Sequence, residues 1–157
     1  MNEQLSFKNG DPVTVTEHRS AYLKEHYLSF THPSGLRIYL FPKNLSTTYA
    51  LYATRFGSAD SDFTVNGEPL SLPEGCAHFL EHKMFEEADG SDAFSFFSAR
   101  GADSNAYTTW DKTAYLFSAT DHEAECLAAL IRFVSDPHFT EASVKKEQGI
   151  IAEEIRM

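Results

Sequence analysis

Residues 75–85, Gly-Cys-Ala-His-Phe-Leu-Glu-His-Lys-Met-Phe, carry the strongest local signal in the 157-residue sequence. A helix advances by about 100° per residue, so His78 and His82 would lie within about 40° of each other, with Glu81 beside them. Lys83 falls among the apolar positions, where its aliphatic stem can follow apolar surface while the ammonium group stays in water. The stretch therefore predicts a helix with an apolar back and a His/Glu/His front.

Two histidines at positions i and i+4 can bind one metal ion, and zinc–nitrogen bonds of about 2.0–2.1 Å require that closeness. A carboxylate beside them, here Glu81, can act as general base toward a water that the metal activates. The order His-x-x-Glu-His reverses the commoner His-Glu-x-x-His arrangement and is a metallopeptidase motif. By itself, this short pattern also fits an exposed polar helix face or a pair of core histidines.

A further helix is predicted from about Thr140, and it offers a third metal ligand. Glu147 and Glu154 lie inside its apolar stripe, whereas Glu153 points about 120° away. A buried carboxylate is costly unless a metal, a charge or hydrogen bonds compensate it, so both are candidate site residues; the alternative is a stripe with an acidic edge. No Gly, Asn or Pro ends this helix, so we expect it to run to Met157 and the chain to be a piece of a longer protein.

Turn residues and runs of β-branched and aromatic residues divide the rest of the chain. The predicted strands are Leu28–His32 and Leu36–Lys43 around Pro33-Ser34-Gly35, Thr48–Phe56, and the pair Ser104–Trp110 and Thr113–Thr120. The other predicted helices are Ser91–Arg100, with Ser91 as N-cap and Gly101 as its stop, and Asp121–Val134.

This order of elements predicts an α+β fold with a mainly antiparallel sheet covered by helices. Residues 59–74, rich in Asp, Asn, Gly and Pro, are expected to form a loop. Residues 1–27 are expected to be an N-terminal arm, whose first 20 residues show little pattern and are expected to be extended, and residues 28–157 one domain.

Composition excludes several classes of protein. The chain is 42% hydrophobic and 13% aromatic, with only 8 Gly and 6 Pro, which argues against a disordered or collagen-like chain. A net charge of −10 argues against nucleic-acid binding. No apolar run approaches the roughly 18–20 residues that cross a bilayer, and no secretory signal opens the sequence. Cys76 and Cys126 are expected to be reduced thiols of a cytoplasmic protein.

Three ordered blocks of the sequence resemble one family. Gly75–Phe85 is similar to the signature of the pitrilysin/insulinase zinc metallopeptidases, which include small bacterial homologues of mitochondrial processing peptidase. The other matching blocks are Gly101–Thr108 with Asp111–Tyr115, and Glu147–Ile155. The resemblance runs from about residue 28 to the end and implies half of a metallopeptidase domain, truncated within its last helix.

The resemblance also implies a set of site residues. One zinc ion would be bound by His78, His82 and Glu154, and Glu81 would be the base that activates the zinc-bound water. Glu147 would orient a ligand histidine. The interval from His82 to Glu154 is a few residues shorter than in the family, which a shortened loop between Gly101 and Pro137 would explain.

Asn105 and Ala106 correspond in this resemblance to an edge strand that pairs with the substrate backbone. For Asn105, a turn-forming residue at the end of a strand is the alternative. The implied activity is that of an endopeptidase that cleaves peptides or unfolded polypeptides. Its second, homologous domain would supply further substrate-binding residues, so we expect the present chain alone to be weak or inactive. An assembly with a second copy or with a different subunit is compatible with the family.

Three alternatives stay open at this stage. A non-catalytic partner subunit of a peptidase complex would not need the intact His-x-x-Glu-His motif. An enzyme like S-ribosylhomocysteine lyase shares the motif but takes a cysteine as third ligand. Cys126 would be the candidate, although its Ala- and Leu-rich surroundings are typical of a core thiol. A structural zinc module would need four protein ligands, whereas the sequence offers three.

Overall fold

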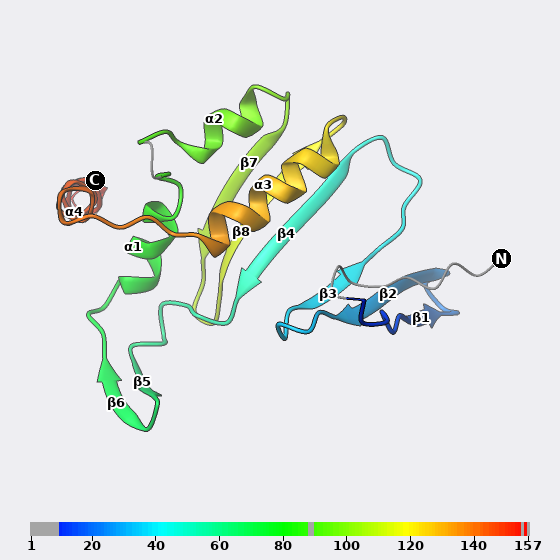
Figure 1. Cartoon of the computed structure of the whole chain (residues 1–157), viewed down its shortest axis with the longest axis horizontal. Helices are drawn as coiled ribbons and strands as arrows, with labels where there is room; N and C mark the ends of the chain where they lie inside the picture. Colours follow the sequence, from blue (N-terminus) through cyan, green and yellow to red (C-terminus); the bar gives the residue numbers. More distant parts are fainter. Residues whose placement is uncertain (1–9, 88–89, 155, 157) are drawn as a thin grey trace. The chain divides into compact units, whose positions relative to one another are not determined.

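The computed structural model describes residues 10–87, 90–154 and 156, and the contacts within the chain divide it into two units after Leu45. In the second unit, strand β8 (Thr113–Ala119) pairs antiparallel with β4 (Thr48–Thr54) and β7 (Asp103–Thr108), in the order β4-β8-β7 (Figure 1). Five of the seven residues of β8 are buried, as expected for a central strand, and β7 forms an edge. The three strands predicted for this region are therefore confirmed.

Helices α2 (Ala93–Ser98) and α3 (Glu123–Ser135) lie over one face of this sheet (Figure 1). Their aromatic side chains pack against those of β8: the ring centroids of Phe97 and Phe117 are 5.8 Å apart, and those of Tyr115 and Phe133 are 5.7 Å apart. These residues belong to a single hydrophobic core. The predicted α+β fold, an antiparallel sheet covered by helices, is confirmed.

Helices α1 (Cys76–Lys83) and α4 (Glu141–Glu154) pack against each other, and α1 also contacts β7 and β8. Helix α1 begins after Gly75, whose φ of 82° lies in the left-handed region that glycine adopts without strain. Helix α4 ends at Glu154, and Arg156 lies in a turn, so the helix does not run on through Arg156. Ile155 and Met157, to which the predictions extended, lie outside the described residues.

Two other local predictions are wrong. The N-cap of α2 is Asp92 rather than Ser91, because Asp92 is extended and its carboxylate accepts the backbone N–H of Phe94 at 2.8 Å. Residues 59–74 are not simply a loop, since β5 (Asp62–Val65) and β6 (Glu68–Ser71) form a hairpin. Its turn is Asn66-Gly67, and both residues have positive φ angles. Asn-Gly is a strong hairpin signal, but all eight residues of the two strands are exposed, so no buried face marks them as strands.

The first unit contains a sheet of β1 (Thr16–Ser20), β2 (Glu25–Thr31) and β3 (Arg37–Leu40), in that order and antiparallel. The predicted hairpin around Pro33-Ser34-Gly35 is confirmed as β2–β3, but β1 was not expected. Residues 1–9 of the predicted arm lie outside the described residues, and the domain boundary after residue 27 stays a prediction. Within the described part of the chain, no helix has the length and apolar character needed to span a membrane.

Candidate metal centre

Helix α1 has one face against α4 and another against strands β7 and β8. Its histidines, His78 and His82, are partly buried and come from successive turns, with ring centroids 4.7 Å apart. Glu81 is only 9% exposed, because α1 lies against β7 and β8. The predicted His/Glu/His front is thus split: the two imidazoles face α4, and the carboxylate lies toward the sheet.

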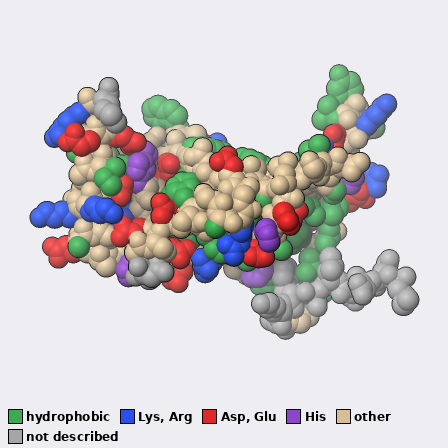
Figure 2. Space-filling model, turned by 90° about the horizontal axis from the view of Figure 1, so that it is seen from above, with side chains coloured by type: hydrophobic (Ala, Val, Ile, Leu, Met, Phe, Trp, Pro, Cys, Tyr) green, Lys and Arg blue, Asp and Glu red, His purple; other side chains and the backbone are tan. Residues whose placement is uncertain are grey.

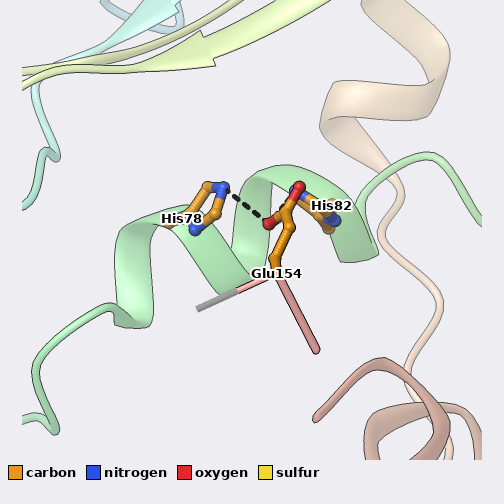
Figure 3. Close-up of side chains that lie close together, drawn as sticks. All are labelled: His78, His82 and Glu154. Atoms are coloured by element: carbon orange, nitrogen blue, oxygen red, sulfur yellow. Dashed lines mark ion pairs between the residues drawn. The ribbon is translucent and has the colours of Figure 1, made fainter. Parts of the chain in front are cut away.

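Glu154 of α4 meets both histidines. One carboxylate oxygen, Oε2, lies 3.7 Å from Nε2 of His78 and 3.7 Å from Nε2 of His82 (Figure 3). Among the described residues, these three form the group of metal-ligating side chains that converge, with their ligand atoms all within 4.8 Å of one another. The side chain of Glu154 is 44% exposed, so it lies at the edge of α4 rather than in a buried stripe.

The donor set fits a zinc ion. Zinc bonds of about 2.0–2.1 Å place tetrahedral ligand atoms roughly 3.4 Å apart, and the carboxylate oxygen of Glu154 already lies near that distance from both imidazole nitrogens. Two histidines and one carboxylate are a ligand set of catalytic zinc sites, in which the fourth position is left for water or substrate. Small side-chain adjustments would complete such a site.

Glu147, also on α4, lies behind His82. Its Oε1 is 3.1 Å from Nδ1 of His82, and Glu147 is itself only 9% exposed. A carboxylate only accepts, so Nδ1 of His82 is the donor in this bond, and Nε2, the nitrogen nearer Glu154, is the one that could bind a metal. Such a bond fixes the tautomer and the ring orientation that a metal ligand needs.

Glu81 is held by the edge strand. Thr108, the last residue of β7, donates its hydroxyl hydrogen to Glu81 Oε2 at 2.6 Å. Burial and, secondarily, the charge of Glu81 raise the pKa of Tyr115 above its usual value of 10.0, so this phenol stays protonated beside the carboxylate. Thr108 was not among the predicted site residues. The alternation of β7 places Thr108 on the same face as Ala106, and this is the signal that could have indicated a role.

Asn105 and Ala106 lie on β7 and do not belong to the metal-ligating group. Asn105 is exposed, and its side-chain oxygen accepts the backbone N–H of Ala106 at 2.8 Å. That N–H is therefore not used by the neighbouring strand β8. Both residues are on an edge strand, as the resemblance implied.

Lys83 is fully buried, which corrects the expectation that its ammonium group reaches water. Its Nζ donates to Glu86 Oε2 at 3.0 Å and lies 5.8 Å from the ring centroid of Phe139. This bond lowers the pKa of the Glu86 carboxyl below its usual value of 4.5. The pair fixes the end of α1 beside the segment that leads into α4.

Cys126 lies on the buried face of α3, is 0% exposed, and packs in the same cluster as Phe97 and Phe133. Burial raises the pKa of its thiol, which disfavours the thiolate that a metal would need. The converging group in the described part of the chain contains Glu154 and not Cys126. A lyase-like ligand set with Cys126 is therefore not favoured.

Charged side chains of both signs are interspersed over the face shown in Figure 2.

The chain is similar to proteins named as zinc proteases. It is 50% identical over 127 residues to YmfH of Bacillus subtilis strain 168, covering 79% of this chain and 29% of YmfH. It is 34% identical over 102 residues to AlbF of the same organism, covering 64% of this chain and 24% of AlbF. Both relatives carry the name zinc protease.

Solved structures agree with this similarity. An M16-like peptidase from Alicyclobacillus acidocaldarius superimposes with a TM-score of 0.77 at 41% identity, over 98% of this chain and 33% of that protein. Pitrilysin, at 16% identity and a TM-score of 0.68, shares the fold. The chain thus spans about a third of the length of these relatives, or less. Because the model of the insulinase family, peptidase family M16, matches residues 71–157, more than half of the chain, the chain belongs to that family.

Proposed function

We propose that the chain is the metal-binding part of a zinc-dependent endopeptidase that hydrolyses peptide bonds in peptides or unfolded polypeptides. The observation that carries the proposal is the convergence of the ligand atoms of His78, His82 and Glu154, with Glu81 immediately before His82 on α1. The names of the relatives, which are zinc proteases, support the same class of activity.

In this proposal each side chain has a separate task. His78, His82 and Glu154 hold the zinc ion, which when bound polarises the peptide carbonyl and acidifies water. Glu81 accepts the proton of the attacking water and passes it to the leaving amine. Glu147 keeps the ring of His82 in its binding orientation through the 3.1 Å hydrogen bond to Nδ1.

The substrate is proposed to pair with β7. An extended peptide can add to an exposed sheet edge through main-chain hydrogen bonds. The backbone N–H of Ala106, now bonded to the Asn105 side chain, is a donor that such a peptide could use instead. Asn105 would then be free to bond the peptide itself.

The proposal also assigns a role to the part of the longer protein that this chain does not include. Since the chain spans 29% of YmfH, further substrate-binding groups would come from the remaining length. We therefore propose that the isolated chain is weak or inactive, and that the complete enzyme works alone or as an assembly with a second copy or another subunit. A cytoplasmic location also stays a proposal.

The test replaces Glu81 with Gln in the full-length protein. The amide keeps the shape of the side chain but cannot accept the proton, so we expect zinc to remain bound while kcat for an unfolded polypeptide falls by about 10²–10⁴-fold. Glu153→Gln is the matched control, because Glu153 lies on α4 next to Glu154 but is 71% exposed and pairs with Arg156. Full activity in Glu81→Gln would overturn the assignment of the base, and a wild-type protein that binds zinc without cleaving any polypeptide would favour the non-catalytic partner.

A further inference from the structure

Strand β7 is connected to the candidate base by one side chain. Thr108 Oγ1 lies 2.6 Å from Glu81 Oε2, across 27 positions of sequence. Among the described residues, Thr108 is the hydrogen-bond donor to the Glu81 carboxylate. Glu81 is only 9% exposed, so water competes poorly for the same oxygen. The bond is charge-assisted, and such bonds are short and roughly twice as strong as neutral ones.

The direction of this bond follows from its acceptor, because a carboxylate has no hydrogen to donate. Thr113, paired with Thr108 across the two strands, is 2% exposed and donates its own hydroxyl hydrogen to the carbonyl of Phe56 at 2.8 Å. The two hydroxyl oxygens are 3.4 Å apart, and the hydrogen of Thr113 is already used. Thr113 could only accept from Thr108, and at 3.4 Å it is the more distant acceptor, so the single hydrogen of Thr108 goes to Glu81 at 2.6 Å. This bond occupies Oε2 and leaves Oε1 as the oxygen available to accept a proton.

The backbone of the same residue faces the free edge of the sheet. In an antiparallel pair, the N–H and C=O groups of successive residues point alternately toward the partner strand and away from it. The N–H of Ala106 bonds to the Asn105 side chain, and that of Thr109 bonds to the carbonyl of Lys112 across the hairpin. Alternation then turns the backbone groups of Ala106 and Thr108 away from β8. A peptide added at this edge would contact the backbone of the residue whose side chain holds Glu81.

We propose that Thr108 is a positioning residue that orients the carboxylate of Glu81 for proton transfer and connects this orientation to the edge strand on which the peptide docks. The inference rests on the proposed function, since it needs Glu81 to act as the base. It predicts that loss of the Thr108 hydroxyl impairs the chemical step and leaves the metal ligands undisturbed. Among the described residues, this hydroxyl is not hydrogen-bonded to His78, His82 or Glu154.

The experiment uses the full-length zinc-loaded protein and an unfolded polypeptide substrate. Thr108→Val keeps the β-branched shape and removes the donor, so kcat is expected to fall by about 10–100-fold, the scale of a misplaced catalytic group, with KM changing less than about threefold. Thr108→Ser restores the donor and is expected to return kcat to within about threefold of wild type. Zinc content stays at one ion per chain, and a crystal structure of zinc-loaded Thr108→Val is expected to show the Glu81 carboxylate in more than one orientation.

Thr113→Val is the matched control, since it removes a hydroxyl of the same strand pair that bonds to Phe56 instead of Glu81. It is expected to lower the melting temperature and to leave kcat unchanged per folded molecule. If Thr108→Val does not fold, Thr108→Ala is read in the same way.

Several results would overturn the inference. They are a kcat of Thr108→Val within twofold of wild type, a Thr108→Ser variant as impaired as Thr108→Val, zinc loss in Thr108→Val, or an unchanged Glu81 orientation in its crystal structure. If Glu81→Gln is inactive in the same assay while Thr108→Val is fully active, the inference about Thr108 fails and the proposed function stands. If Glu81→Gln is itself fully active, the proposed base is wrong, and the inference fails with it.

Discussion

Helices α1 and α4 carry the side chains of the candidate metal centre, but they are held in different ways. Helix α1 lies against β7, β8 and α4, and it buries Ala77, Glu81 and Lys83. Helix α4 packs against α1 and leaves Ile150 44% exposed, as exposed as the side chain of Glu154. The distance between the two histidines is therefore set within one helix. The position of the third ligand depends on how α4 is fixed to α1.

The hydrogen bond between His82 and Glu147 joins the two helices at the site, so its loss should have the largest effect. We expect Glu147→Ala to weaken zinc binding by about 10–100-fold, as is usual when the partner of a ligand histidine is removed. Glu147→Gln, which keeps a neutral acceptor, should lose less. Zinc affinity is measured in the full-length protein by competition with a chelator of known affinity.

Glu153→Ala is the control for that experiment, because its exposed side chain pairs with Arg156, in the turn after α4. It should bind zinc like the wild type. Equal zinc affinities of Glu147→Ala and Glu153→Ala would show that α4 places Glu154 without this bond, and the comparison of the two helices would then lose its basis.

The second effect concerns how firmly the end of α1 is anchored. Lys83 is buried, and Glu86 is the carboxylate that its ammonium group meets. Glu86→Gln exchanges a charge-assisted bond for a neutral one, so the free energy of unfolding should fall by about 1 kcal/mol. The lowered pKa of Glu86 means that its contribution is present above the unfolded pKa and is lost as the pH falls through the lower, folded value.

Thermal unfolding at several pH values tests this prediction. The difference between wild type and Glu86→Gln should be full at pH 6–7 and should disappear as the pH falls below the usual carboxyl value of 4.5. Glu87→Gln is the control: Glu87 is as exposed as Glu86, but its partner Arg132 is 56% exposed, so a smaller loss is expected. A difference that persists unchanged at pH 3 would contradict the role assigned to the ion pair.

The difference between the two helices also explains what the sequence could predict. The pairing of His78 with His82 follows from spacing along one helix, and the strands follow from local composition and turns. The hydrogen bond from Thr108 to Glu81 joins residues 27 positions apart, and the burial of Lys83 depends on the segment around Phe139, so neither follows from local periodicity. The meeting of Glu154 with the histidines was expected from resemblance, whereas helical periodicity wrongly indicated that Glu154 lies in a buried stripe.

The smallest effect separates the intrinsic stability of α4 from its contacts. Gly149 lies inside α4, and a Cβ added there meets no atom within 4 Å. Alanine is about 0.8–1 kcal/mol more favourable than glycine inside a helix, so Gly149→Ala should raise the free energy of unfolding of α4 by up to that amount and raise the melting temperature slightly. Gly57→Ala is the opposite control, because a Cβ there would lie 2.5 Å from backbone atoms of the β7–β8 turn and must destabilise the fold. If Gly149→Ala instead lowers the melting temperature of the full-length protein, another part of that protein must cover α4 at Gly149. The exposure of α4 would then not hold in the full-length protein, and the contrast with α1 would disappear.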